Sequence, residues 1–277
     1  MEEVKVEKKG GVEPKVYSHS RLWLYENCPE FYKVKYIDKL PIEMPVHMAL
    51  FLGKAVHDSL EWLYHQVKNR DVSIDELIEN FTDEWISSFS EDIRVVNGDE
   101  KELYNRGIKF LVDYYTKHYP FKENVVAIER KILFPLDEKG EYMIQGYIDR
   151  LDLNNGIYEV HDYKTNAYLK RQEEIDKDRQ LALYHLGLKN EFGNDIQVKL
   201  IWHFLSFNMS ITSQRTEYEL EKLRRDTLSL IKEIESTTEW PACGKKFCDW
   251  CNFKEENNIN YEQISQDVYK LKNLSFS

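Results

Sequence analysis

One segment in the middle of the chain, residues 146–165, has the residue types and spacing for metal-assisted hydrolysis. Asn155-Gly156 is a strong signal for a two-residue β-hairpin turn, because a type I′ turn needs positive φ at both central positions. With that turn, Asp149 lies directly opposite Asp162, and their Cβ atoms are roughly 4.5–5.5 Å apart on one face of the hairpin. Lys164 is two residues beyond Asp162 and points to the same side.

The face that carries these charges makes a bound cation the expected partner. Its other residues are mostly apolar: Tyr147, Leu151, Leu153, Tyr158 and Val160. Two opposed like charges repel, and burying them against apolar neighbours costs more still. A divalent cation compensates for this, and a lysine beside it can position or activate a water. The alternative is a surface hairpin with solvated charges, in which Arg150 neutralises a second acidic pair on the other face, Asp152 and Glu159.

Composition limits the classes of protein that this chain can be. Its 277 residues suffice for one large domain or two small ones, and no run of 18 apolar residues predicts a transmembrane helix. The first residues lack the apolar core of a secretory signal, so we expect a cytoplasmic protein without a membrane partner. In that reducing compartment, four cysteines are expected to be metal ligands or free thiols. A net charge of −11 disfavours indiscriminate nucleic-acid binding but permits a local basic groove.

Hydrophobic periodicity predicts a helical first half and an α/β second half. Helices are expected over residues 20–27, 48–67, 74–89 (opened by a capping box at Ser73), 100–117, 173–189 and 217–236. Strands are expected over residues 125–134, 142–151, 157–164 and 197–206. We expect a flexible arm over residues 1–15 and a single domain over 16–277, divided into a mainly helical part (16–120), an α/β catalytic core (121–236) and a cysteine-rich C-terminal segment (237–277).

Five short motifs follow one another along the chain: Cys28-Pro-Glu-Phe-Tyr32, Gly53-Lys-Ala-Val-His57, Gly146-Tyr-Ile-Asp149-Arg-Leu-Asp152, Asp162-Tyr-Lys164 and Gln180-Leu-Ala-Leu-Tyr184. In this order they resemble the PD-(D/E)XK nuclease superfamily. The closer resemblance is to its RecB-like exonuclease branch, which includes CRISPR-associated and AddB-type nucleases with an iron–sulfur cluster. Ile148 precedes the first aspartate where the superfamily name has proline, as is common in this branch. The resemblance implies a restriction-endonuclease-like mixed β-sheet core of order α-β-β-β-α-β, with a helical N-terminal half and a C-terminal cysteine clasp.

The resemblance also implies roles for individual residues. The catalytic set would be Asp149, Asp162, Lys164, Gln180 and Tyr184. The ligands of a Mg²⁺ or Mn²⁺ ion would be His57, Asp149, Asp162 and the backbone carbonyl of Tyr163. The lysine would orient the attacking water or stabilise the transition state, and the glutamine and tyrosine would contact a substrate phosphate or the carboxylates. Glu129 and Arg150 are interpreted as structural.

The cysteines form a second constellation. Cys243, Cys248 and Cys251 lie within nine residues, and Cys28 is more than 200 residues away. Four thiolates bind either a 4Fe-4S cluster or a tetrahedral Zn²⁺, and spacing alone does not choose between them. The resemblance to the iron–sulfur nucleases favours the cluster, which would clasp the N-terminal helix to the C-terminal segment. Aromatic residues of this segment, Phe247, Trp250 and Phe253, are expected to shield it from water.

The sequence thus predicts a metal-dependent nuclease. The resemblance implies an exonuclease that acts on DNA ends, on single strands in particular, in repair, recombination or CRISPR spacer processing. Its partners would be a helicase or CRISPR adaptation proteins. One alternative is a non-catalytic DNA-binding or assembly subunit with a structural metal or cluster site, although such a scaffold has no need of two opposed carboxylates. Another is a redox or interaction protein in which the hairpin is incidental.

Overall fold

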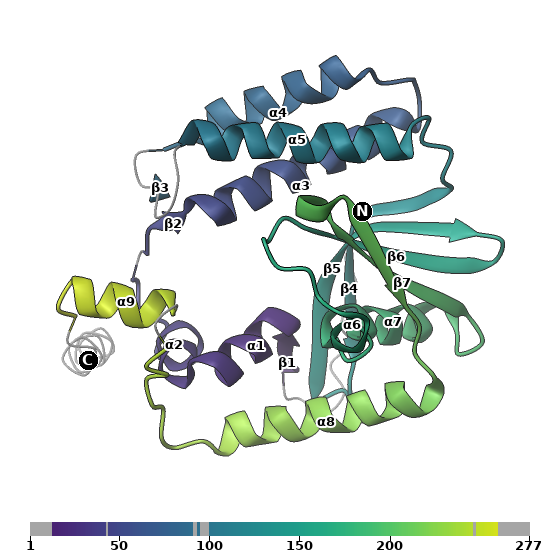
Figure 1. Cartoon of the computed structure of the whole chain (residues 1–277). Coiled ribbons are helices and arrows are strands. Elements are labelled where there is room, and N and C mark those ends of the chain that lie inside the picture. Colours follow the sequence, from purple (N-terminus) through teal and green to yellow (C-terminus); the bar gives the residue numbers. More distant parts are fainter. Residues whose placement is uncertain (1–12, 43, 91–92, 95–99, 246–247, 260–277) are drawn as a thin grey trace. The chain divides into compact units, whose positions relative to one another are not determined.

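The computed structural model describes residues 13–42, 44–90, 93–94, 100–245 and 248–259 (Figure 1). The chain divides into two compact units. The first comprises Met1–Val16 and Pro45–Arg225, and the second comprises Tyr17–Met44 and Asp226–Ser277. The single domain with internal boundaries at residues 120 and 236 stays a prediction, and most of the expected N-terminal arm lies outside the described residues. None of the helices described is long and apolar enough to cross a membrane.

The first unit is built on a six-stranded mixed sheet of order β1-β5-β6-β7-β8, with β4 also paired to β5. Strands β6 and β7 are parallel, because the chain crosses between them through a helix, and the pairs β4–β5, β5–β6 and β7–β8 are antiparallel. The strands are β1 (Lys15–Ser18), β4 (Val125–Pro135), β5 (Tyr142–Asn154), β6 (Ile157–Lys164), β7 (Gln197–Phe204) and β8 (Met209–Ser213). This sheet confirms the expected mixed α/β fold class.

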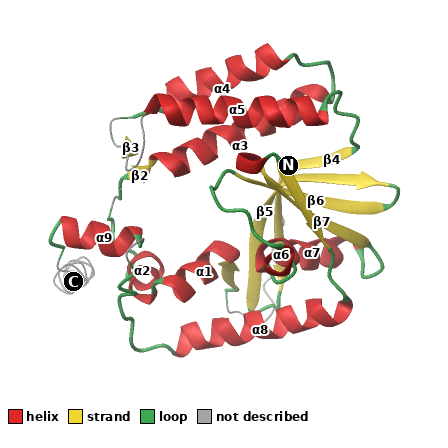
Figure 2. Cartoon of the chain, in the orientation of Figure 1, coloured by secondary structure: helices red, strands yellow, loops and turns green. Residues whose placement is uncertain are grey.

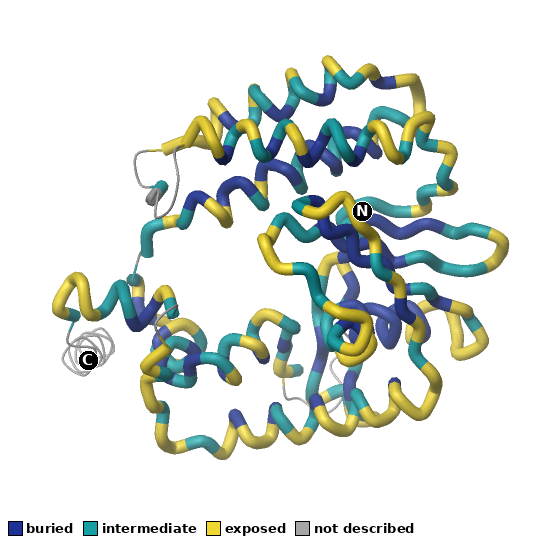
Figure 3. The backbone as a smooth tube through the Cα atoms, viewed as in Figure 1, coloured by how far each residue is buried: buried dark blue, intermediate teal, exposed yellow. Residues whose placement is uncertain are grey.

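Helices cover both faces of the sheet (Figure 2). On one side lie α3 (Met48–Val67), α4 (Ile74–Ser88) and α5 (Glu100–His118). A short parallel strand pair accompanies them: β2 (Val46–His47) directly precedes α3, and β3 (Ile93–Arg94) lies between α4 and α5 in the sequence. On the other side lie α6 (Gln172–Ile175) and α7 (Arg179–Phe192). The buried apolar faces of α3, α4 and α5 form one core cluster that includes Tyr163 of β6. The strands β5 to β7 and the inward sides of α3, α5 and α7 are the most buried parts of this unit (Figure 3).

The second unit is a small helical assembly. Its helices are α1 (His19–Asn27), α2 (Pro29–Tyr32), the π-helical turn η1 (Lys33–Ile37), the last part of α8 (Glu217–Ser236) and α9 (Asp249–Glu256). Its core packs Cys28, Val34, Leu40, Trp250 and Cys251 together. The unit therefore gathers chain segments that are far apart in the sequence.

Most of the predicted elements are confirmed, and α3 has the expected bounds. The capping box at the start of α4 is present, with Ser73 and Glu76 bonded reciprocally. The helix expected over residues 173–189 is wrong, because it is divided into α6 and α7. Asp178 has extended backbone angles and caps α7 by accepting from the backbone N–H of Gln180. The short elements α2, β1, β8 and α9 were not expected.

The β5–β6 hairpin has the predicted turn and register. Asn155 and Gly156 both have positive φ, at 51° and 79°, and Asn154 pairs with Ile157. The ladder ends at the pair of Arg150 with His161, one pair before the two aspartates.

The predicted side-chain alternation along β5 is wrong beyond Asp149. Gly146 lies against Tyr184 of α7, whereas Arg150 lies against Tyr64 of α3 on the other face of the sheet. Residues four apart in a regular strand share one face, so the alternation reverses between them. The neighbouring strand β4 reverses at the same level, because Ile132 faces α7 and Ile128 joins the α3–α5 cluster.

Candidate functional site

The two aspartates expected to hold a metal lie at this reversal. The Asp149 carboxylate accepts a hydrogen bond from the backbone N–H of Tyr163 at 2.8 Å, so it replaces a backbone acceptor where the β5–β6 ladder ends. The Asp162 carboxylate accepts hydrogen bonds from Lys164 Nζ at 3.0 Å and from Gln180 Nε2 at 2.9 Å. The hairpin therefore delivers one carboxylate from each strand, as its register predicts.

Helix α3 brings His57 to the same place. Its Nε2 lies 2.7 Å from the backbone oxygen of Tyr163, and its Nδ1 lies 3.5 Å from Asp149 Oδ2. One turn earlier, a Cβ on Gly53 would stand 3.1 Å from Thr165 Oγ1, which is tighter than ordinary contact. The glycine thus lets α3 approach the end of β6 closely enough for the histidine to reach the site.

Helix α7 supplies the other side of the site. Lys164 Nζ donates to Gln180 Oε1 at 2.9 Å, and Gln180 Nε2 lies 3.4 Å from the Tyr184 hydroxyl. A Cβ on Gly146 would meet the Tyr184 ring at 2.4 Å, so this glycine makes room for the tyrosine. The glutamine holds the lysine and the carboxylate of Asp162 in one arrangement.

Glu129, which its sequence context indicates to be a structural residue, belongs to this site. The pairs Ile128 with Arg150 and Arg130 with Ile148 place Glu129 directly opposite Asp149. Glu129 has a φ of 45°, in the left-handed region that non-glycine residues rarely adopt. Ligand atoms of His57, Glu129 and Asp149 all lie within 4.8 Å of one another. Counting the register outward from the β4–β5 turn would have found this residue.

The charges of the site fit a divalent cation. Burial, and then the charge of Asp162, raises the pKa of Asp149 to about 8. Burial, and then the charge of Asp149, raises the pKa of Glu129 to about 7. Burial acts to lower the pKa of Lys164, but the Asp162 carboxylate raises it above its usual value, so the lysine stays protonated. Carboxylate oxygens, a carbonyl oxygen and an imidazole are ligands that suit Mg²⁺ or Mn²⁺, and a cation would relieve the repulsion between the carboxylates.

Comparison with known proteins agrees with this geometry. The family model described as "PD-(D/E)XK nuclease superfamily" matches residues 16–255. The chain belongs to the PD-(D/E)XK nuclease superfamily. Members of this superfamily are usually phosphodiesterases that use divalent metals, with DNA as the substrate.

Other comparisons add little to the superfamily match. The crystal structure of SSO0001 aligns over 83% of this chain and 95% of its own, with 13% sequence identity and a TM-score of 0.36. A likeness of that size says nothing about activity. No curated protein sequence matches the chain.

Behind the superfamily motifs lies a buried polar network on the α3–α5 face of the sheet. Arg150 forms an ion pair with Asp152 at 3.1 Å and donates to the Tyr114 hydroxyl at 2.8 Å. His161 lies against the same guanidinium, and its Nδ1 is 2.8 Å from His203 Nε2. Burial, followed by nearby positive charges, holds the pKa of both histidines well below the usual range, so Arg150 carries the positive charge of the network.

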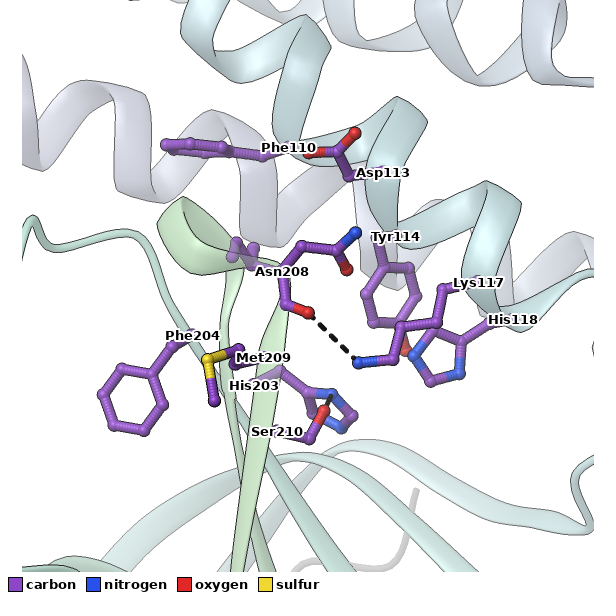
Figure 4. Close-up of a pocket in the computed structure, with 11 residues that line it drawn as sticks. Phe110, Asp113, Tyr114, Lys117, His118, His203, Phe204, Asn208, Met209 and Ser210 are labelled. Atoms are coloured by element: carbon purple, nitrogen blue, oxygen red, sulfur yellow. Dashed lines mark hydrogen bonds between the residues drawn. The ribbon is translucent and has the colours of Figure 1, made fainter. Parts of the chain in front are cut away.

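The network reaches a small pocket between α5 and the start of β8 (Figure 4). There His203 Nδ1 lies 3.0 Å from the Ser210 hydroxyl, and Lys117 donates to the backbone oxygen of Asn208. Tyr114 and His118 stack beside them. This pocket lies on the face opposite to Gln180 and Lys164, so we assign its polar residues to the core and not to the site.

The four cysteines lie together in the second unit. Their sulfur atoms are all within 4.8 Å of one another, and Cys243 Sγ is 3.6 Å from Cys251 Sγ. Tetrahedral Zn²⁺ with bonds of about 2.3 Å separates its sulfurs by about 3.8 Å, so the observed spacing fits a single ion. A 4Fe-4S cluster holds its cysteines farther apart, and loading one would move the thiols outward.

Residues around the cysteines tie α2 to α9. The Glu30 carboxylate accepts hydrogen bonds from Trp250 Nε1 at 2.7 Å and from Lys254 Nζ at 2.8 Å. Trp250 is fully buried, and Phe253 packs against the same cluster. Phe247, which was also expected to shield the site, lies outside the described residues.

Proposed function

We propose that this chain is a metal-dependent DNA exonuclease that hydrolyses phosphodiester bonds at DNA ends. The observation that carries the proposal is the convergence of Asp149, Asp162, Lys164 and His57 from three elements of a PD-(D/E)XK fold. An assembly subunit without catalysis would not need to hold an ammonium against one of two neighbouring carboxylates. The resemblance to the RecB-like branch supports the choice of DNA ends, of single strands, and of repair, recombination or CRISPR spacer processing as the setting.

The residues divide the chemistry between them. His57, Asp149, Asp162 and the carbonyl of Tyr163 would hold Mg²⁺ or Mn²⁺, which supplies a more acidic bound water and offsets the charge on the phosphate. Lys164 stays protonated at neutral pH and presents an ammonium next to the carboxylates. There it stabilises negative charge that develops on the phosphate during attack by water.

The two remaining residues of the catalytic set support this centre. Gln180 fixes the orientation of Lys164 and Asp162 through its amide. Tyr184 closes the site against β5, where its hydroxyl accepts from the backbone N–H of Tyr147. These assignments explain why the glutamine and the tyrosine are one turn apart on α7.

A cleavage assay tests the proposal. End-labelled single- and double-stranded DNA and covalently closed circular DNA are incubated with the wild-type chain and Mn²⁺ or Mg²⁺. We expect loss of mononucleotides from free ends, no cleavage of closed circles, and no activity in D162A or K164A. The substitution K139A, in the exposed β4–β5 turn, serves as the control for a lost lysine. Unchanged cleavage in folded D162A and K164A would refute the assigned site, and DNA binding without cleavage by the wild type would favour the assembly subunit.

For the cysteines we propose a 4Fe-4S cluster, supported by the resemblance to the iron–sulfur nucleases. Zn²⁺ is the second candidate, because the sulfur spacing favours a single tetrahedral ion. Metal analysis of anaerobically purified protein and its absorption near 400 nm distinguish the two. We expect about four iron atoms per chain and their loss in C248S. Stoichiometric zinc without the absorption band would show that the four cysteines bind zinc and not a cluster.

The cellular setting is also a proposal. The chain is proposed to act in the cytoplasm, and the resemblance supports a helicase or CRISPR adaptation proteins as partners. The helicase partner would supply the unwinding of duplex DNA. Addition of a helicase to the assay should then extend digestion into duplex DNA.

A further inference from the structure

We propose that Glu129 is a direct ligand of the catalytic cation, together with His57 and Asp149. This inference rests on the proposed function, because it assigns a further residue to the same metal site. Nothing in the superfamily motifs of this chain includes Glu129, which comes from β4, outside all five of them.

The backbone places the Glu129 carboxylate at the site. Its register partner is Asp149, and both strands reverse their side-chain alternation at this pair. The reversal on β4 passes through the left-handed φ of Glu129 itself. One carboxylate oxygen of Glu129 then lies within 4.8 Å of a ligand atom on both His57 and Asp149, a separation that one shared ion can span.

The surroundings of Glu129 lack a positive charge that would balance its carboxylate and those of its neighbours. Among the described residues, no hydrogen bond or ion pair satisfies its half-buried carboxylate. Its charged neighbours include Asp149, Glu61 and Asp58, and His57 is the neighbour that offsets them. The lysine of the site, Lys164, is held by Asp162 and Gln180. A divalent cation between Glu129, His57 and Asp149 supplies the charge that this cluster lacks.

The donor set also indicates which cation. An imidazole nitrogen beside two carboxylates binds Mn²⁺ more strongly than Mg²⁺, because affinity for nitrogen donors rises along the transition metals. We therefore expect the site to prefer Mn²⁺, and we expect Glu129 to contribute to that affinity directly.

Manganese binding by the metal-free full chain tests this without any nuclease reaction. Free Mn²⁺ is followed by electron paramagnetic resonance as protein is added, for the wild type, E129Q, D149N and E138Q. Glu138 lies in the exposed β4–β5 turn, so E138Q makes the same chemical change on the same hairpin away from the site. Thermal unfolding of each variant is measured in EDTA and in Mn²⁺.

We expect E129Q and D149N to weaken Mn²⁺ binding by about tenfold or more, and E138Q to bind as the wild type does. In EDTA, E129Q should unfold at the wild-type temperature or above it, because a repulsive charge has been removed. In Mn²⁺ it should gain less stability than the wild type, a pattern that loss of a merely structural glutamate would not produce. If E129Q does not fold, the same measurements are made on E129D. Its side chain keeps the negative charge but is one methylene shorter, so it should not reach the cation.

Two results would overturn the inference, and they differ in their meaning. Wild-type Mn²⁺ affinity in E129Q or E129D, with binding lost in D149N, would exclude Glu129 as a ligand and leave the proposed nuclease site intact. Failure of the wild-type chain itself to bind Mn²⁺ would remove this inference, and failure to bind Mg²⁺ as well would remove the proposed function.

Discussion

Arg150 offers the sharpest test of how the hairpin supports the site, through the substitution R150M. The guanidinium is 1% exposed and forms an ion pair with Asp152, which is 0% exposed. Methionine fills similar volume but leaves the buried carboxylate with His161, at 3.1 Å, as its remaining ionisable contact. Breaking a buried pair in this way costs about 3–5 kcal/mol, because one charge is left uncompensated.

The loss of stability expected in R150M can be checked by also replacing its partner, Asp152. Replacing both partners by apolar side chains of similar size removes the unpaired charge, so R150M/D152L should recover most of the lost stability. The tyrosine hydroxyls that lose the arginine keep each other, since Tyr64 and Tyr114 are 2.7 Å apart and Tyr114 and Tyr163 are 3.3 Å apart. The double variant should therefore be closer to the wild type than R150M is.

The same reasoning predicts how the loss of stability in R150M changes with pH. Burial raises the pKa of Asp152 even with the arginine present, and loss of the arginine raises it further. A carboxyl whose folded pKa is raised destabilises the protein increasingly as the pH rises from its unfolded pKa of about 3.9 to the folded value, because the unfolded state releases the proton first, and the full penalty remains above the folded value. The loss of stability in R150M should therefore be smaller at pH 5 than at pH 8.

Urea unfolding followed by circular dichroism measures these free energies, with R171M, at the exposed residue that precedes α6, as the control. We expect the midpoint to fall in R150M and the slope to stay constant, as for a two-state change in stability. A loss below about 1 kcal/mol in R150M would refute the reasoning, because it would mean that the buried charge of Asp152 is tolerated alone. A double variant no more stable than R150M would refute it equally.

Three further predictions concern residues on or beside α7. G146A should lower stability by about 1–3 kcal/mol, because its Cβ would lie 2.4 Å from the Tyr184 ring, and G146A/Y184L should recover part of the loss in urea titrations. Burial holds the pKa of His185 at about 4, against about 6.5 unfolded, so this histidine should contribute about 3 kcal/mol to the loss of stability as the pH drops from 6.5 to 4. The fall in stability over this range should be smaller in H185L than in the wild type by about that amount, and an equal fall in the two proteins would contradict the assignment. Q180L should slow cleavage by about 10–100-fold, whereas Q172L, on exposed α6, should cleave as the wild type does; equal rates would show that the amide does not orient the site.

Local chemistry explains which parts of the fold were predictable. The turn at Asn155-Gly156 followed from its own residues, and it fixed the pairing of β5 with β6 as far as Arg150 and His161 without knowledge of the rest of the sheet. Asp149 and Asp162 follow directly beyond that last pair. The bounds of α3 followed from the spacing of its apolar residues, because that helix packs one continuous face. Features determined within a few residues, or by one regular period, were therefore visible in the sequence.

Features that depend on contacts across the sheet were not visible. The positive φ of Glu129 has no local signal, since glutamate does not favour that conformation, and it brings the residue to the site only because Asp149 lies opposite. The division between α6 and α7 was missed for a different reason. Asp178 is a good N-cap, but the period of apolar residues continues across it, so the sequence pattern resembles that of one unbroken helix.

The reversal of β5 explains why one short motif contains both a site residue and core residues. In a regular strand, Asp149 and Arg150 would occupy opposite faces, and Arg150 would share its face with Gly146. Because the alternation changes at Asp149, the strand buries Ile148 and leaves room for Tyr184 before the reversal, and it buries the ion pair of Arg150 and Asp152 after it. The buried pair therefore anchors the strand immediately beside the Asp149 carboxylate, on the side away from Gln180. Arg150 also donates to the hydroxyl of Tyr163, and the backbone N–H of Tyr163 donates to the Asp149 carboxylate. On this reasoning Arg150 and Asp152 act on the metal site through position, and a stable R150M/D152L variant should bind Mn²⁺ with reduced affinity while its cysteine site is unaffected.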